Sequence, residues 1–205
     1  KLVAQGCDTT DAVILDVKET YETLAAKINA DLQAEFLANN PGVAANNLYK
    51  EEKFEEAIEK YQEAIEQEED DIKKGEYYFS IASIQFRKLN QKSTARATAL
   101  KAANLKPNWG RPYLLIGDMY ASSTRCRNDG YGQALIVLAA INKYSYAKSI
   151  DDDPEVATDA NRKIGLYNGS IPLREDAFQR GHKDGQSIST GCWVGEKVKL
   201  RTRTD

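Results

Sequence analysis

The sequence predicts an all-α protein of antiparallel helix pairs that ends in a short extended or β-hairpin tail. Two patterns predict this class. Small and aromatic residues recur at a spacing of 34 residues in the middle of the chain, and after Gln186 the helical period gives way to alternation. With 205 residues, 41% hydrophobic and 29% charged, the chain also has the composition of a folded domain with its own core.

The middle of the chain carries the clearest pattern. In the segment from Gly75 to Pro107, aromatic residues lie on a first predicted helix and alanines on a second, and Pro107 closes the unit. Small residues let two helix backbones approach closely, and aromatic rings fill the space that remains. A shift of 34 residues carries one set of positions onto another of similar character: Phe79, Ala82, Ser83 and Phe86 become Tyr113, Ile116, Gly117 and Tyr120.

The run Phe54-Glu55-Glu56-Ala57-Ile58, with Tyr61 and Ala64, and the run from Tyr113 to Tyr120 resemble the tetratricopeptide repeat (TPR) family. The resemblance covers residues 42–153 and implies three repeats that form a TPR-like right-handed superhelix of antiparallel helix pairs. The third repeat departs from the pattern, because residues 122–132 are inserted between its two helices. The insertion is interpreted either as a functional loop or as a longer surface turn.

The two flanks are predicted from local signals. Residues 1–41 form an N-terminal helical cap or degenerate repeat, with two helices between residues 10 and 40. Residues 154–205 form a C-terminal helical pair and the tail, with Asp153 as N-cap and Pro154 at the first helical position. Within the tail, Ile188 and Val198 lie in alternating segments that flank a predicted turn at Gly195-Glu196.

Composition excludes several classes of function. The net charge of -3 and pI near 5.4 provide no positive field for nucleic acid, and the longest apolar run is too short to span a bilayer. A lone His182 and three cysteines without paired spacing predict no metal site and no catalytic residues. No phosphate-binding loop is present, so no cofactor is expected and the chain is predicted not to be an enzyme.

The cysteines leave alternatives open. Cys126 lies in the insertion and Cys192 in the tail, so a disulfide between them would hold the tail on the third repeat. It would stabilise the folded chain by about 3 to 4 kcal/mol. The alternative is two unrelated free thiols, and the sequence slightly favours the bond. Gly6-Cys7 is weakly similar to a lipoprotein cleavage site, and lipidation of Cys7 is not expected.

A partner is predicted to bind in the concave groove, which the first helix of each TPR pair lines. For any one of these residues the alternative is an ordinary solvated helix face. The Lys and Asn clamp of chaperone-binding TPR proteins is not expected, since Gly42 and Ile81 occupy two of its positions. The predicted groove residues are Asn46, Tyr49, Lys50, Tyr77, Ile84, Arg87, Lys88, Arg111, Leu114 and Asp118.

The segments Lys106 to Tyr113 and Gly191 to Glu196, with the cysteine of the insertion, also resemble exported TPR proteins of Bacteroidetes. This resemblance implies a periplasmic or outer-membrane location and no particular activity. A first residue other than Met fits a processed or trimmed chain.

Three hypotheses follow. The first is a protein-interaction scaffold or adaptor, a subunit of an envelope assembly. The second is a ligand-binding or enzymatic module with a pocket around Cys126, Trp193 and His182. The third is a self-associating structural module, in which the stack pairs through Trp109 or the exposed end of its last helix.

Overall fold

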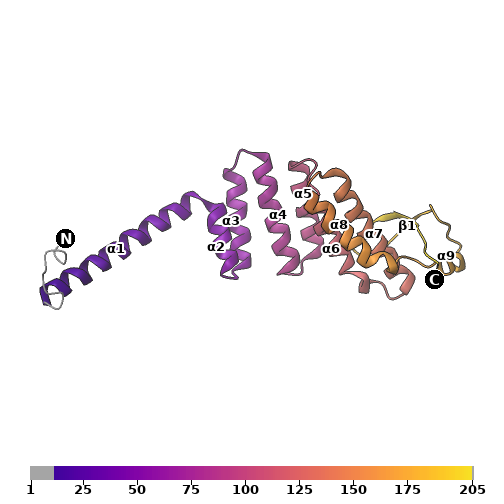
Figure 1. Cartoon of the computed structure of the whole chain (residues 1–205), viewed down its shortest axis with the longest axis horizontal. Coiled ribbons are helices and arrows are strands. Elements are labelled where there is room, and N and C mark those ends of the chain that lie inside the picture. The colour runs from indigo at the N-terminus through magenta and orange to yellow at the C-terminus, as the bar shows by residue number, and fades with distance from the viewer. Residues whose placement is uncertain (1–11, 205) are drawn as a thin grey trace.

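The structure is a computed structural model that describes residues 12–204, and almost all of its regular structure is helical (Figure 1). The all-α class and the C-terminal hairpin are therefore confirmed for this part of the chain. The helices are α1 Ala12–Asn39, α2 Pro41–Lys50, α3 Phe54–Gln67, α4 Asp71–Arg87, α5 Lys92–Leu105, α6 Arg111–Ala121, α7 Gly130–Ile150, α8 Pro154–Tyr167 and α9 Arg174–Gln179. The short elements are the 3-10 turns η2 Thr124–Cys126 and η3 Asn168–Ser170 and the strands β1 Ser187–Ser189 and β2 Lys197–Lys199.

Helix α1 corrects one prediction. Two helices were expected between residues 10 and 40, but residues 12–39 form a single helix. The physical reason is that no Gly or Pro interrupts this segment before Pro41. Figure 1 shows α1 extending away from the other helices. Cys7, for which lipidation was considered, lies outside the described residues.

Helices α2 to α7 pack in pairs, α2 with α3, α4 with α5 and α6 with α7, and each runs back along its predecessor (Figure 1). Three of the turns between them contain a residue in the left-handed region, namely Glu52, Asn90 and Asn108 with φ of 61°, 54° and 59°. Asparagine tolerates this region better than most residues, which suits it to two of these turns. The assignment of the pairs to repeats, and with it the superhelix, stays a prediction.

Alanines at the helix crossings are fully buried, among them Ala57, Ala82 and Ala99. In the third pair a glycine faces a larger residue. Tyr144 stands at the position that corresponds to Ala99, and Gly117 on the facing helix makes room for it, since a Cβ on Gly117 would overlap the Tyr144 ring. The close contact between α6 and α7 is thus kept because a glycine faces the larger ring.

The C-terminal part begins as predicted. The Asp153 side chain accepts a hydrogen bond of 2.9 Å from the backbone N–H of Glu155 and caps α8. Strands β1 and β2 are antiparallel, with Ile188 opposite Val198. Val198 is 2% exposed, so the hairpin packs its apolar face against the helices and leaves its lysines in solvent.

One hydrophobic cluster joins the third pair to everything that follows it. Leu115 of α6, Ile136 of α7, Val156 of α8 and Val194 of the tail belong to this cluster. A second, smaller cluster lies between α2, α3 and α4. The core is therefore continuous from the third pair across Asp153 into the C-terminal part.

Candidate functional site

Most of the predicted groove residues lie on the helices that open each pair. Asn46, Tyr49 and Lys50 belong to α2, Tyr77, Ile84 and Arg87 to α4, and Arg111, Leu114 and Asp118 to α6, while Lys88 directly follows α4. Side-chain contacts connect these helices with one another and with α8. We call the surface that carries Tyr49, Lys88, Arg87, Asp118 and Lys163 the first-helix face. Its role in binding a partner stays a prediction.

At one end of the first-helix face, a lysine lies against two aromatic rings. The Nζ of Lys88 is 5.7 Å from the centre of the Tyr49 ring and 5.1 Å from that of Phe54. The two rings are 5.8 Å apart and tilted by 58°. Tyr49 remains 40% exposed, so the cation and the ring edge both face solvent. Such a group offers rigid contact area and a hydrogen-bond donor on one surface.

The other end of the face is occupied by an ion-pair network around Asp118. Lys163 of α8 donates hydrogen bonds of 2.6 and 2.7 Å to the two Asp118 oxygens, and the Tyr144 hydroxyl donates one of 3.0 Å. The Arg87 guanidinium approaches the same carboxylate at 3.6 Å. Asp118 thus ties α6 to α7 and α8, and its oxygens are largely used within the chain.

The pKa values in this network are shifted away from neutrality. Burial, and then the negative charge of Asp118, raise the pKa of the Tyr144 hydroxyl. Partial burial acts to raise the pKa of Asp159, but hydrogen bonds from Arg162 and Lys163 outweigh it and the pKa is lowered. The phenol stays protonated and the carboxylate ionised around pH 7, which suits a structural network rather than acid–base catalysis.

Arg111 connects the start of α6 with the start of α8. Its guanidinium lies 3.2 Å from an Asp153 oxygen and 2.9 Å from a Glu155 oxygen. The pKa of Asp153 is lowered, first by the hydrogen bond from the Glu155 backbone N–H and then by Arg111. Arg111 therefore stabilises an N-terminal cap in addition to any contact it makes with a partner.

The four remaining buried or packed groove residues also have contacts within the chain. Ile84 is 3% and Leu114 7% exposed, so both side chains belong to the core and offer little surface. Asn46 accepts a hydrogen bond of 2.7 Å from the Tyr61 hydroxyl. Tyr77 packs against Gly42, where a Cβ would lie 2.8 Å from its hydroxyl oxygen. The open part of the face is thus smaller than the predicted set.

Sequence reasoning missed two members of the face. Lys163 was not selected because α8 was not treated as the first helix of a further pair, although Asp159 and Lys163 show the i, i+4 charge spacing of one helix side. Phe54 was assigned only to repeat packing. Its position at the start of α3, close to Lys88, depends on how α4 ends, which the repeat pattern alone does not specify.

The second candidate region is the junction of the tail with α5, α6 and α7, which we call the tail junction. The predicted disulfide is confirmed: Cys126 and Cys192 are bonded, with their Cα atoms 6.1 Å apart. Arg96 of α5 donates a hydrogen bond of 2.6 Å to the Val194 carbonyl oxygen, and its guanidinium lies 5.5 Å from the centre of the Trp193 ring. The tail is held by a covalent bond and by polar contacts.

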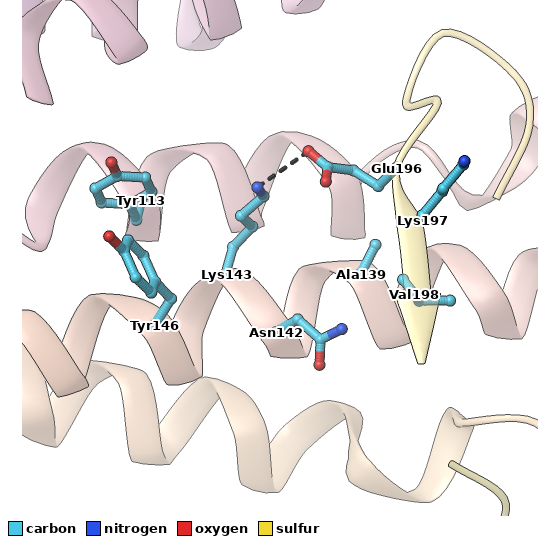
Figure 2. A pocket seen from close by; sticks show the side chains of 8 residues that line it. All are labelled: Tyr113, Ala139, Asn142, Lys143, Tyr146, Glu196, Lys197 and Val198. Atoms are coloured by element: carbon cyan, nitrogen blue, oxygen red, sulfur yellow. Dashed lines mark ion pairs between the residues drawn. The ribbon is translucent and has the colours of Figure 1, made fainter. Parts of the chain in front are cut away.

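Glu196 anchors the other side of the tail. The Tyr120 hydroxyl donates a hydrogen bond of 2.6 Å to its carboxylate, and the Lys143 Nζ lies 3.0 Å from the same oxygen (Figure 2). Partial burial acts to raise the pKa of Glu196, but the bonds from Tyr120 and Lys143 outweigh it and the pKa is lowered. Burial raises the pKa of Tyr120, and Glu196 raises it further.

A cavity of about 350 Å³ lies beside this anchor, between α6, α7 and β2 (Figure 2). Tyr113 and Tyr146 line one end, with ring centres 4.7 Å apart, and Lys143 and Glu196 line the other. The polar atoms of Lys143 and Glu196 point toward each other, as the dashed line in Figure 2 shows. The cavity therefore has an aromatic end and an end that holds an ion pair.

A second hollow of about 400 Å³ lies where the sequence predicted a pocket, between the insertion and the tail. Lys92, Arg125, Cys126 and Trp193 are among its lining residues. Lys92 donates its hydrogen bond to the Ser122 carbonyl oxygen at 2.8 Å. His182 is not among the residues that line it, and instead its Nδ1 lies 2.8 Å from the Tyr131 hydroxyl.

Within residues 12–204, no group of three or more His, Cys, Asp or Glu side chains is arranged to hold a metal ion. In the same range, no helix is long and apolar enough to cross a bilayer. The fold and these two regions define the class: a protein of stacked helix pairs that ends in a disulfide-anchored β-hairpin. Neither a protein-family model nor a curated protein matches the sequence.

Proposed function

We propose that this chain is a non-catalytic, tetratricopeptide-type scaffold or adaptor that holds a protein or peptide segment on its first-helix face. One observation carries the proposal: Lys88 lies against the exposed ring of Tyr49 and the half-buried ring of Phe54, and Arg87 next to it is exposed as well. Cations and aromatic rings on one surface are the combination enriched at binding hot spots.

The chemistry of this surface favours a segment that carries a carboxylate. Arg87 is 56% exposed at its side chain, and its partner Asp118 already receives two hydrogen bonds from Lys163. Its guanidinium therefore retains donors for a ligand. Lys50 and Lys88 are exposed as well, so an acidic peptide would meet three cations next to two apolar rings.

The test uses a library of extended acidic peptides and a triple variant, Tyr49→Ala with Arg87→Ala and Lys88→Ala. We expect the variant to bind selected peptides at least about tenfold more weakly, or about 1.4 kcal/mol, as measured by titration calorimetry. Arg111 is left unchanged because it also stabilises the start of α8.

The matched control removes a similar pair on another side of the chain. The Lys101 Nζ lies 5.6 Å from the centre of the Tyr78 ring, and Tyr78 precedes Arg87 by about 2.5 helical turns, so it faces the opposite side of α4. Tyr78→Ala with Lys101→Ala should leave the affinity unchanged. Equal affinities of the triple variant and the wild type would refute the proposed face.

We place the scaffold in an oxidising compartment, the bacterial periplasm or outer surface, in keeping with the resemblance to exported proteins of Bacteroidetes. The Cys126–Cys192 disulfide supports this, because such bonds persist in oxidising environments and are rare in the cytosol.

A second function, the binding of a small ligand, has support from the hollow beside the disulfide. Its lining combines Lys92 and Arg125 with Trp193, which suits a small anionic ring compound. Fragment screening by NMR tests this idea, with resonance shifts at Trp193 as the expected result.

A further inference from the structure

Among the residues that the structure describes, helix α1 meets the rest of its chain at the junction with α2. It is 28 residues long, and as the structure describes it none of these residues is buried. Helices in proteins gain most of their stability from packing one apolar side, and an isolated helix in water is marginal. A helix of this length without buried residues therefore calls for a partner outside the chain.

Apolar side chains gather on one side of α1. Six of them follow one another at intervals of three or four residues, and at 100° per residue they fall within an arc of about 120°. All six are about half exposed or more. We call this set the α1 stripe: Val17 55%, Tyr21 71%, Leu24 56%, Ile28 49%, Leu32 58% and Phe36 50% exposed.

We propose that α1 pairs with α1 of a second copy of this chain, in antiparallel orientation, through the α1 stripe. The spacing of the stripe is nearly the same when read from either end. Val17 then lies opposite Phe36 of the second copy, Tyr21 opposite Leu32, and Leu24 opposite Ile28. A two-fold dimer requires this reciprocity, because residue i must meet j while j meets i.

The area of the stripe suits a stable dimer. With roughly 100 Å² of exposed side-chain surface each, the six residues present about 600 Å² per helix. Adding the flanking atoms, a pair buries on the order of 1,200 to 1,400 Å², which falls within the range of specific interfaces. Figure 1 shows α1 projecting from the rest of the chain, so antiparallel pairing places the two stacks at opposite ends.

The charge of α1 argues against a membrane surface as the occupant. The helix carries five acidic residues and two lysines, a net charge of -3. Amphipathic helices that lie on anionic lipid carry Lys and Arg on their polar side instead. A second α1 needs no such attraction, because most of the charged residues of the helix lie outside the arc of the stripe and remain in solvent, and Glu35 within the arc is exposed.

The first experiment measures the mass of the chain in solution by light scattering across a concentration series. We expect a dimer whose dissociation constant rises at least tenfold when Ile28→Glu is introduced. Leu15→Glu is the matched control, because Leu15 is also 50% exposed but lies about 120° from the centre of the stripe. This variant should dimerise like the wild type.

The second experiment tests the orientation in a background where Cys7 is replaced by Ser. Ala25→Cys lies near the centre of the antiparallel pair and should form a covalent dimer on oxidation. Glu35→Cys should not, since its two copies are about 26 Å apart along the axis. Covalent dimers from both variants would indicate parallel pairing and overturn the orientation.

Three results would overturn the pairing itself. The first is a monomer at all concentrations, and the second is a dimer that Ile28→Glu leaves unchanged. The third is a wild-type chain that stays monomeric in buffer and binds anionic phosphatidylglycerol vesicles. The outcome is independent of the proposed function, because peptide affinity at the first-helix face does not depend on α1.

Discussion

The two ends of the described chain contrast. Helix α1 is the longest regular element, yet it has no buried residue, whereas β1 and β2 have three residues each and Val198 of β2 is 2% exposed. The tail is fixed by a disulfide, by Arg96 and by Glu196, and α1 by its junction with α2. Regular secondary structure and attachment to the core are thus separate properties.

The largest expected effect concerns the disulfide. Replacing Cys126 and Cys192 together with Ser should lower the free energy of unfolding by about 4 kcal/mol, because the bond closes a loop with a sequence separation of 66 residues. Urea titration followed by tryptophan fluorescence measures this change, since Trp193, one of the two tryptophans, lies next to Cys192.

Chemical reduction provides the control for this variant. Wild type in a reducing agent and the double Ser variant should have the same urea midpoint, and the agent should leave the variant unchanged. A wild-type midpoint that does not move on reduction would show that polar contacts alone hold the tail, and would weaken the contrast with α1.

A smaller effect is expected from Glu196→Gln. It should lower the free energy of unfolding by about 1 kcal/mol at pH 7, because the charge paired with Lys143 is lost. The sign of the pH dependence follows from the pKa of Glu196, which is lowered in the folded chain from its ordinary 4.5. The ionised carboxylate therefore stabilises the fold above pH 4.5, and this contribution disappears as the pH falls through the lowered pKa.

The measurement compares urea midpoints of wild type and Glu196→Gln between pH 7 and pH 3. Their difference should shrink as the pH falls. Glu155→Gln is the control, because Glu155 also forms an ion pair, with Arg111, but its side chain is 80% exposed, so its removal should change the free energy of unfolding little. A difference that stays constant with pH would show that the charge of Glu196 does not anchor the tail.

Much of the fold could be predicted because short, local sequence patterns specify its helices and turns. The helix pairs follow from alanines and rings at regular intervals, the start of α8 from Asp153 and Pro154, and the tail hairpin from alternation around Val198. The disulfide followed from the position of each cysteine in an irregular segment. The single helix α1 was not predicted, since two helices were expected between residues 10 and 40.

The candidate site was harder to predict because its contacts join distant residues. Arg96 and Val194 are 98 positions apart, and Asp118 meets Lys163 across 45. Periodicity assigns a residue to a side of its helix and does not specify what packs there. For this reason Ile84 and Leu114 were assigned to an open groove, whereas the neighbouring helices bury both.

The smallest expected effect concerns α1. At concentrations where the chain is monomeric, Leu24→Ala should change the free energy of unfolding of the helix stack by less than about 0.5 kcal/mol, since Leu24 is 56% exposed. Leu115 is 2% exposed, and Leu115→Ala should lower the free energy of unfolding by about 2 to 5 kcal/mol in the same urea titration. A comparable loss from both would mean that α1 packs on its own chain in solution, so that the two ends differ less than their burial indicates.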